Sequence, residues 1–491
     1  MAQAGRKPQI FESVRVPLIG THNTRQSTAG ALVDKDQRFQ NFFPVKLKNS
    51  ITGKETYYLV KRPGFESFIT PAAGNVGTAI HLFETVSGNQ LISAFGATNS
   101  TVYIGAGNLG TITGFVRSFT EVDYTGTATV VMPSSNHEAW YYPFSGTLTK
   151  ISDVDFPGNA GQSLIGDFVT MDGYLFIMDR TGRIWNSDLN SITAWTSTSF
   201  IGPTYYTGLG VGIARHHDSI VAFLSSSIEF FTNEGDSPSP LRRREMVVAN
   251  IGAVATGGFG PTIHQHRDKI FFVGTSRAGG AGIYKIEKYA VDKISTQPVD
   301  QLIEVVEPSN VTLTSARIWG MDLLLANMGT LSFVYVIDYD IWVEMSSTTA
   351  LWSKIAASAE ADAKVYSLSV VSTAGKIYEW NTDTPVWQDN GVAYTATART
   401  SLIDFDTEKR KRYHKIKLIG DKQASTTTVG VSWTDDDYGT YSSVRNVDMS
   451  QNRAYLTQCG QSRRRAFVFT NATNTPCRIE ALELDYSICD S

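Results

Sequence analysis

Two pairs of histidines come closest, among the residues of this chain, to the spacing of a metal site. His264 and His266 are separated by one residue, so in a β-strand both imidazoles would lie on one face and could chelate zinc. The sequence offers no third ligand nearby, and we interpret this pair as surface or interface histidines. The adjacent His216 and His217 would point to opposite faces of a strand and are a weaker candidate. We predict no metal ion.

A short acidic run, Asp435–Asp437 followed by Gly439, has the composition of a calcium loop. It lacks the alternating carboxylates and the terminal Glu of an EF-hand. A solvated hairpin turn is therefore the better interpretation.

Three cysteines, Cys459, Cys477 and Cys489, lie near the C-terminus. This odd and sparse set is no disulfide framework, and no two of them have the C-x-x-C spacing of a zinc site. We expect free thiols in a reducing compartment, with a Cys459–Cys477 bridge as the alternative.

Three runs of basic residues stand out in a chain whose formal net charge is −4. They comprise Arg242, Arg243 and Arg244; Lys409, Arg410, Lys411 and Arg412; and Arg463, Arg464 and Arg465. Such runs are solvated loops, contacts for a protein partner, or sites that offset phosphate charge without reading a nucleic-acid sequence. Because no aromatic residues are interleaved with them to stack bases, we favour a protein contact over proximity to DNA.

The common catalytic motifs are missing from the sequence. It contains no G-x-x-x-x-G-K-[ST], no G-x-S-x-G and no H-E-x-x-H. The nearest approach to the Asp-box of sialidase propellers, residues 187–195, lacks both the spaced Asp and the Gly. We therefore predict no catalytic residues, no cofactor and no enzymatic activity.

The composition is that of a folded protein with a large core. Hydrophobic residues make up 42% of the 491 residues and charged residues only 18%, which argues against disorder. The pI of about 6.1 gives no reason to expect wholesale nucleic-acid binding. Residues 1–15 hold no apolar signal segment, and no apolar run approaches the ~18 residues of a membrane span. We expect a soluble protein without a membrane partner.

Short strands that recur at a coarse period are the elements that would position these residues. Seven apolar hairpins begin at intervals of 37–54 residues, at Asn89, Asn136, Gly173, Asp218, Asp268, Asp322 and Ala363. Hairpins spaced every 40–50 residues are typical of a β-propeller, in which radial stacking protects the strand edges. We predict an all-β fold with a six- or seven-bladed β-propeller. A pair of β-sandwiches or an irregular β-rich chain is the alternative.

Beyond residue 390 the strands become longer and alternate between polar and apolar residues, as in 414–420 and 478–486. This alternation is typical of an antiparallel sheet with one solvated face. We therefore predict a second antiparallel β-sandwich or barrel. The predicted domains are an N-terminal extended arm at 1–74, partly packed on the β domains, the propeller at 75–390 and the second β domain at 391–491.

Helical segments are scarce in this pattern. Residues 299–308 could form one short helix that ends at Pro308, and residues 353–363 could form another. The boundary between the two β domains is expected within residues 381–391, which are rich in Asp, Pro and Gly.

A charged and aromatic stretch near the N-terminus, residues 35–47, has the period of neither a helix nor a half-buried strand. It holds Phe39, Phe42 and Phe43, and soluble chains rarely leave three clustered rings in water. Phe42 and Phe43 are adjacent and would point in opposite directions in an extended chain. We predict that at least two of the rings are buried, against the β domains or a neighbouring subunit.

The motifs at the N-terminus, taken in order, resemble the podophage tail-nozzle or tail-hub family, which includes the packaged-DNA stabilisation protein of P22-like phages. The matching positions are Val16, Pro17, Leu18 and Gly20; Gln37, Arg38, Asn41, Phe43 and Pro44; and Pro63 and Gly64. Val45 departs from the family, in which Glu usually follows this proline. Residues 208–235 and 334–345 are similar to two blades of the family.

The resemblance implies a structural virion protein with no enzymatic role. Members of the family form rings, usually hexamers, on the short tail below the portal and the head-to-tail adaptor. They close or line the DNA exit channel, retain packaged DNA and offer sites for tail fibres or tailspikes. The implied partners are further copies of the chain, the adaptor, fibre or tailspike proteins and, non-specifically, phage DNA. Such a protein is made in the cytoplasm of the bacterial host and ends in the virion.

Two other functions stay open at this point. A carbohydrate-binding or glycan-cleaving propeller would need paired carboxylates ~5–10 Å apart, and a monomeric propeller could serve as an adaptor for a cellular partner. In a tail channel, many phosphate contacts would retard DNA exit, so we expect at most one basic run to face the lumen. The segment Lys409–Arg412 is the best candidate for a contact with the adaptor or a neighbouring subunit.

Overall fold

The computed structural model divides into two compact units. The first, which we call the propeller unit, contains Glu66–Ile341 and Ser347–Asp383. The second, which we call the C-terminal unit, contains Met1–Phe65, Trp342–Ser346 and Thr384–Ser491, so the chain passes between the units four times. The structure describes residues 12–18, 38–48, 55–85, 88–144, 146–203, 208–257, 261–276, 279–329, 331–346, 351–352, 354–357, 364–370 and 373–489.

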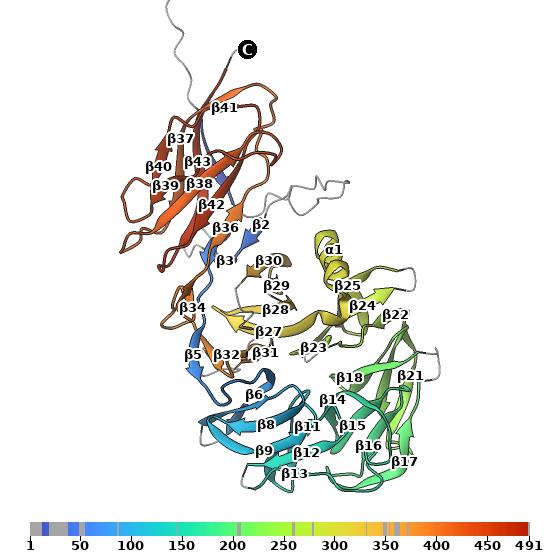
Figure 1. Cartoon of the computed structure of the whole chain (residues 1–491). Coiled ribbons are helices and arrows are strands. Elements are labelled where there is room, and N and C mark those ends of the chain that lie inside the picture. The colour runs from blue at the N-terminus through green and yellow to red at the C-terminus, as the bar shows by residue number, and fades with distance from the viewer. Residues whose placement is uncertain are drawn as a thin grey trace, which may run out of the picture. The chain divides into compact units, whose positions relative to one another are not determined.

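The described strands of the propeller unit form seven antiparallel blades, which confirms the predicted propeller (Figure 1). Six blades are separate sheets, and the strands of the sixth belong to a larger, nine-stranded sheet. Each of the seven predicted hairpins falls in a different sheet. The strands of the successive sheets are β6 (Gly77–Thr85), β7 (Gly88–Phe95), β8 (Asn99–Ile104) and β9 (Gly107–Thr113); β10 (Thr120–Tyr124), β11 (Thr127–Pro133), β12 (Ala139–Pro143) and β13 (Thr149–Lys150); β14 (Leu164–Met171), β15 (Tyr174–Asp179), β16 (Ile184–Ser187) and β17 (Trp195–Ile201); β18 (Gly210–His216), β19 (Ser219–Leu224), β20 (Ile228–Asn233) and β21 (Leu241–Ala249); β22 (Ile251–Ala253), β23 (Ile263–His266), β24 (Lys269–Ser276), β25 (Ala281–Glu287) and β26 (Ala290–Lys293); β27 (Thr312–Ile318), β28 (Met321–Met328) and β29 (Leu331–Val336); and β31 (Lys354–Ala357), β32 (Lys364–Leu368), β33 (Ile377–Asn381) and β5 (Glu66–Ile69).

The ring closes through β5, a strand from the opposite end of the chain. β5 pairs antiparallel with β33, with Ile69 opposite Ile377 and Ser67 opposite Tyr378. It is thus the outermost strand of the seventh sheet, although the first sheet follows it directly in sequence. The first strands of the blades contact one another in turn, from β14 through β18, β23, β27 and β31 to β6, and they surround the middle of the propeller in Figure 1.

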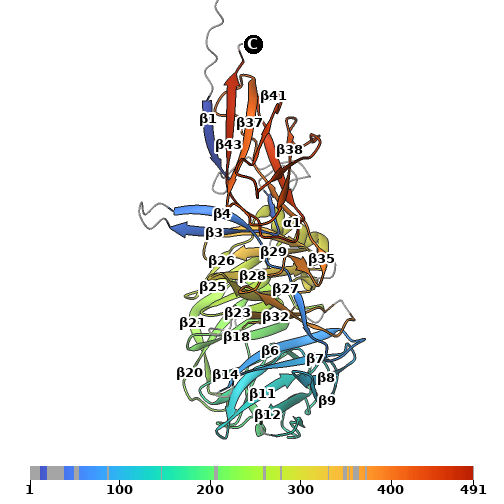
Figure 2. The ribbon, with the colours of Figure 1, turned by 90° about the vertical axis from the view of Figure 1, so that its left-hand side faces the viewer.

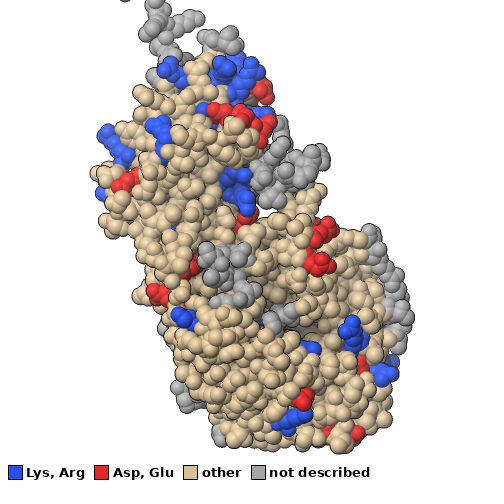
Figure 3. Space-filling view, in the orientation of Figure 1, with Lys and Arg blue, Asp and Glu red and all other residues tan. Residues whose placement is uncertain are grey.

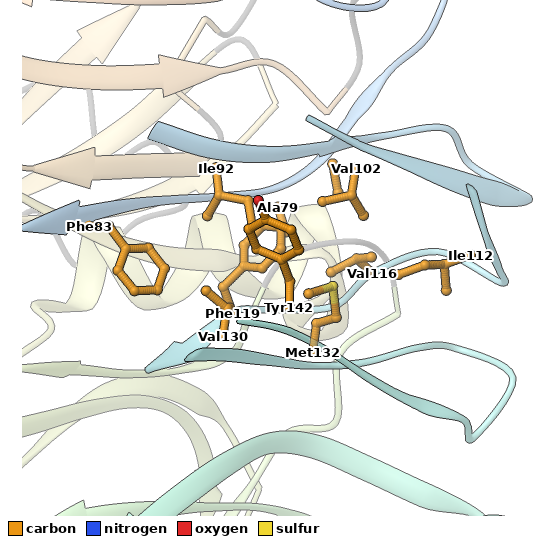
Figure 4. Close-up of a cluster of buried hydrophobic side chains, with 11 residues drawn as sticks. Ala79, Phe83, Ile92, Val102, Ile112, Val116, Phe119, Val130, Met132 and Tyr142 are labelled. Atoms are coloured by element: carbon orange, nitrogen blue, oxygen red, sulfur yellow. The ribbon is translucent and has the colours of Figure 1, made fainter. Parts of the chain in front are cut away.

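The propeller core lies between neighbouring blades. On β11, Val130 and Met132 pack in the cluster shared with the first blade (Figure 4), whereas Val131 packs in the cluster shared with the third. Both faces of each sheet are covered in this way, so blade strands are continuous apolar runs. β19 and β28 are buried at every position.

The helix expected at 299–308 is confirmed by α1 (Gln297–Val306), which buries Val299 and Ile303 and is followed by the 3-10 turn η2 (Pro308–Asn310). The helix expected at 353–363 is wrong where the structure describes it, because Lys354–Ala357 form β31, paired with β32. Strand pairing at the blade overrides the helix propensity of this alanine-rich segment. Residues 358–363 lie outside the described residues. No helix in the described part of the chain is long and apolar enough to cross a bilayer.

The C-terminal unit is a sandwich of two sheets, the first of the two forms predicted for it. One sheet contains β3 (Phe42–Lys48), β4 (Glu55–Lys61), β43 (Arg478–Ile488), β37 (Lys411–Gly420) and β40 (Tyr455–Thr457), with β1 (Glu12–Pro17) beside β43 and β41 (Gln461–Ser462) beside β37. The other contains β30 (Ile341–Ser346), β2 (Arg38–Gln40), β36 (Ala396–Arg399), β42 (Ala466–Asn471), β38 (Thr428–Thr434) and β39 (Arg445–Asp448). β34 (Gln388–Asp389) and β35 (Val392–Ala393) form a separate hairpin. The rings of Tyr413 and Phe467 meet edge to face between the sheets.

The N-terminal aromatic residues are buried, as predicted. The exposed fractions of Phe39, Phe42 and Phe43 are 7%, 0% and 0%. Phe39 belongs to β2, and the other two begin β3, which pairs with β4 along its length (Figure 2). Their contact with a neighbouring subunit stays a prediction.

We expect Phe95→Ala to destabilise the propeller far more than Phe68→Ala. Phe95 is 2% exposed in the cluster between the seventh and first blades, whereas Phe68 on β5 is 48% exposed. Truncation of a buried Phe costs about 3–5 kcal/mol, and an exposed one costs much less. Urea unfolding of both variants tests this, and equal midpoints would contradict the closed ring.

Candidate functional site

Asn41, one of the motif residues, joins three segments of the C-terminal unit. It lies between β2 and β3 with a φ of 57°, a conformation that Asn tolerates better than most residues. Its amide nitrogen donates to the Thr395 carbonyl (2.8 Å) and the Ser346 hydroxyl (3.1 Å). Its Oδ1 accepts from the Ser346 N–H (3.1 Å) and from Nε of Arg62 (2.9 Å).

Arg62 is the most buried charge of this network, with 0% of its side chain exposed. Its Nη1 and Nη2 donate to Oδ1 and Oδ2 of Asp389 at 2.9 and 2.5 Å, and Nη2 also donates to the Ser346 carbonyl. The guanidinium lies 3.9 Å from the ring centre of Tyr394. Burial alone would lower the pKa of Arg62, but the charge and hydrogen bonds of Asp389 raise it above its ordinary value.

A second ion pair, between Arg38 and Glu344, lies beside Asn41. Nε and Nη2 of Arg38 donate to the two carboxylate oxygens of Glu344, each at 2.5 Å. This fork-to-fork geometry is the strongest form of an Arg–carboxylate contact. A backbone hydrogen bond joins the same two segments, because the Asn41 N–H donates to the Glu344 carbonyl at 2.8 Å.

Gly64, of the Pro-Gly motif, is required by a close approach of two backbones. A Cβ at this position would lie 1.9 Å from the carbonyl oxygen of Gln388. The Gly64 N–H donates to the Val386 carbonyl at 2.6 Å, and the Phe65 N–H donates to Asp389. The motif residues therefore build a framework, which we call the Arg62 network: Arg38, Asn41, Arg62, Gly64, Glu344, Ser346 and Asp389.

We expect Arg62→Ala to lower the free energy of unfolding of the C-terminal unit by about 3–5 kcal/mol, because it leaves the Asp389 carboxylate buried without its partner. Arg15→Ala, which removes the half-exposed pair with Glu480, is the matched control and should cost at most about 1 kcal/mol. Chemical denaturation followed by tryptophan fluorescence measures both. Equal losses of unfolding free energy in the two variants would contradict the structural role of the Arg62 network.

The first basic run, on β21, is engaged within the propeller unit. Arg242 is exposed and pairs with Glu234 at 3.3 Å. The Arg244 guanidinium lies 4.5 Å from the ring centre of Tyr289 and donates to its hydroxyl at 2.7 Å. Arg243 is half-buried. This run therefore presents little free charge.

The second basic run is divided by the start of β37. Lys409, Arg410 and Arg412 are exposed, whereas Lys411 is buried. The Lys411 ammonium donates to the carbonyl oxygens of Thr407 and Arg463, and burial lowers its pKa. Lys411 is thus a structural residue, and its contact role in the predicted run stays without support.

The third basic run pairs with the acidic run. Arg465 is 1% exposed and donates to both carboxylate oxygens of Asp435, at 2.7 and 2.8 Å, while Arg464 pairs with Asp437. The Arg465 guanidinium also lies over the rings of Tyr413 and Trp433. Only Arg463 of this run is exposed.

Asp436 shapes the turn between these pairs, as the hairpin interpretation predicted. It accepts hydrogen bonds from the Thr434 hydroxyl and the Thr440 N–H, both at 2.8 Å. The hydrogen bonds from Thr440 lower the pKa of Asp436 to about 2. The described residues contain no group of three His, Cys, Asp or Glu side chains that could hold a metal ion.

The exposed charges of the second and third runs form one patch, which sequence spacing did not show. β41 pairs with β37, with Arg412 opposite Gln461 and Lys411 opposite Ser462. Arg463 follows directly. We call Lys409, Arg410, Arg412 and Arg463 the β37 patch. Figure 3 shows Lys and Arg gathered over the unit that holds these strands.

The paired histidines lie at the interface between the fifth and sixth blades. The Ser315 hydroxyl on β27 lies 2.8 Å from Nε2 of His264 and 3.0 Å from Nδ1 of His266, both on β23. Nε2 of His266 lies 3.6 Å from the Asp322 carboxylate. Burial lowers the pKa of His264 to about 3 and also lowers the pKa of His266. The interface interpretation is confirmed, and the pair serves as a polar clamp between blades.

This clamp predicts a loss of stability in acid. His264 stays neutral in the fold down to about pH 3, whereas in the unfolded chain it takes a proton below its ordinary pKa of 6.5. Stability is therefore fully present above pH 6.5 and falls as the pH drops towards 3, by up to about 1.4 kcal/mol per pH unit. In His264→Asn this slope should be shallower than in the wild type. Thermal midpoints from pH 7.5 to 4.5 measure it, and parallel curves would refute the assignment.

The three cysteines are free thiols, as expected, and no Cys459–Cys477 bridge forms. Cys459 and Cys477 are buried and Cys489 is half-buried. Burial raises the pKa of Cys477 to about 12, so its thiolate form is negligible at neutral pH.

A closed seven-bladed ring defines a β-propeller protein. A family model described as "Bacteriophage P22 Gp10, beta-propeller" matches residues 27–378. The chain belongs to this family of phage stabilisation proteins, and it is a phage structural protein. No curated protein matches the chain.

The solved structures that match the fold do so weakly. Raptor from Chaetomium thermophilum has a TM-score of 0.41 at 10% identity, over 66% of this chain and 30% of that chain. BamB from Moraxella catarrhalis has a TM-score of 0.39 at 9% identity, over 70% of this chain and 97% of that chain. The computationally designed Ika8 protein has a TM-score of 0.36 at 11% identity, over 64% and 99%.

Proposed function

We propose that the protein forms the ring-shaped nozzle of a short phage tail, most simply a homo-hexamer below the portal and adaptor. In this position it would close or line the DNA exit channel, retain packaged DNA and help anchor fibres or tailspikes. It would have no enzymatic role. The family match over residues 27–378 carries the proposal, and the charge distribution supports it.

The net charge of −4 is the sum of two opposite charges. The propeller unit holds 18 Lys and Arg against 29 Asp and Glu, a net charge of −11, and the C-terminal unit holds 25 against 18, a net charge of +7. An acidic propeller would repel DNA phosphates and let the duplex slide past it. A basic sandwich suits attachment to an acidic protein partner.

The β37 patch is the best candidate for that attachment. Its four side chains are exposed, while the charges of Lys411 and Arg465 are used inside the fold. Because the exposed members of the second and third runs adjoin one another, they would face the same partner. A ring would multiply them by its subunit number, and on the channel wall they would hold DNA. We therefore place the patch at the adaptor or at a neighbouring subunit.

The double variant Arg410→Ala/Arg412→Ala should weaken ring formation or adaptor binding at least tenfold while the thermal midpoint changes little, since exposed charges add little to stability. Lys422→Ala/Arg453→Ala removes two exposed charges of the same unit outside the patch and is the control. Native mass and negative-stain images of the protein, with and without the adaptor of the same phage, give the readout.

Wild-type assembly in both double variants would contradict the contact role of the patch. A protein that stays at its 53.9 kDa monomer mass even with the adaptor would contradict the nozzle itself. If that monomer bound glycans displayed on an array, the carbohydrate-binding alternative would be favoured.

A further inference from the structure

Helix α1 ends in an exposed apolar side chain between two carboxylates. Val305 is 81% exposed, the largest value among the exposed large hydrophobic side chains that the structure describes. Glu304 and Glu307 are exposed beside it, whereas Val299 and Ile303 form the buried face of the helix. We call Glu304, Val305 and Glu307 the α1 end. A single exposed apolar side chain is ordinary on a protein surface, and the charges around it are the informative feature.

The negative charge of the α1 end is not offset within the described part of the chain. The C-terminus of a helix carries partial negative charge, which basic side chains usually balance, but the last turn of α1 holds none. Asp300, one turn earlier, is paired with Lys293 at 2.7 Å. Glu304 and Glu307 form no ion pair among the described residues, and Glu307 has a φ of 79°, a conformation that favours glycine. A cationic partner would relieve the repulsion between these carboxylates and the helix end.

The β37 patch offers a complementary set of cations. Arg410 and Arg412 flank the buried Lys411, and the Arg410 carbonyl continues the strand pairing by accepting from the Cys489 N–H at 2.8 Å. Side chains two residues apart in an extended chain lie on one face, about 7 Å from each other. The two carboxylates of the α1 end lie about one helical turn apart, roughly 5–6 Å. Each guanidinium can therefore donate two N–H groups to one carboxylate.

An apolar side chain accompanies the cations of the β37 patch as well. Ile488 on β43 lies opposite Lys411 and is 39% exposed. It adjoins the cations as Val305 adjoins the carboxylates. The two surfaces therefore match in charge and in apolar content, a combination that suits a specific protein contact.

We propose that the β37 patch of one copy of the chain docks on the α1 end of the next copy. The inference rests on the proposed nozzle function and selects a neighbouring subunit, in place of the adaptor, as the partner of the patch. The two surfaces belong to units with net charges of +7 and −11, which favours their encounter. Because the contact joins two different surfaces, it repeats head to tail and can close into a ring.

Charge reversal followed by mixing tests the contact. Arg410→Glu/Arg412→Glu makes the patch acidic, and Glu304→Arg/Glu307→Arg makes the α1 end basic. Each variant alone should lose at least about tenfold in self-association, because like charges then face each other. An equimolar mixture restores opposite charges at every contact in alternation, and should form rings of even subunit number at nearly the wild-type concentration. Native mass spectrometry and sedimentation of the full-length proteins, with the adaptor present where the wild type requires it, give the readout.

The control reverses two exposed carboxylates in the second and fourth blades, Asp123→Arg/Asp236→Arg. Mixed with the variant whose patch is acidic, it should not restore rings. A second measurement needs no variant: zero-length carbodiimide cross-linking of isotope-labelled and unlabelled wild type. It should join Lys409 to Glu304 or Glu307 of a differently labelled copy.

Three outcomes would contradict the contact. Wild-type rings without rescue in the mixture, or cross-links from Lys409 only to other carboxylates, would overturn the contact and leave the nozzle function intact. Rescue by the control variant would show an attraction between net charges alone and would also overturn the assigned contact. A wild type that stays monomeric even with the adaptor would overturn both the contact and the nozzle function.

Discussion

The C-terminal unit depends on one buried guanidinium, that of Arg62. A charge with no solvent exposure is tolerated only when its donors are satisfied, and Asp389, Ser346 and Asn41 satisfy them. These partners come from parts of the chain more than 300 residues apart, so the pair forms only when all of them are in place. The chain enters or leaves the C-terminal unit at Phe65, Trp342, Ser346 and Thr384, and the network holds a residue within five positions of each crossing.

The propeller is subject to a different constraint, and because of it the blades could be predicted from the sequence. A blade is covered on both faces, so its middle strands must be apolar throughout. Seven apolar hairpins could therefore be identified in the sequence, one for each blade. The closing strand β5 was not predicted, because Glu66–Ile69 is a short, half-exposed segment whose partner lies more than 300 residues away. The segment at Lys354–Ala357 was mistaken for a helix for a similar reason: its alanines favour a helix locally, and only the pairing with β32 makes it a strand.

The candidate sites were predictable as residues but not as contacts. A run such as Arg463–Arg465 looks uniform in sequence, yet the fold exposes Arg463 and buries Arg465 against Asp435. Spacing could not pair the acidic run with it, since the two lie about 30 residues apart and meet only through the sheet. The N-terminal motif was predictable as a pattern, whereas the role of Arg62, its central charge, was not, because a single basic residue carries no signal in sequence.

The two architectures also decide where charge can be placed. Blade strands such as β19 and β28 are buried at every position, so they offer no place for solvated charge. A sandwich leaves one face of each sheet wet, and β37 alternates accordingly, with Arg412 exposed and Tyr413 buried. A flat strand can therefore present a row of cations at fixed spacing, which a blade core cannot do. Under the proposed nozzle function, one part of the chain would adhere to a partner and another would let DNA pass. A division of these tasks between a sandwich and a propeller would follow from how each fold buries its strands.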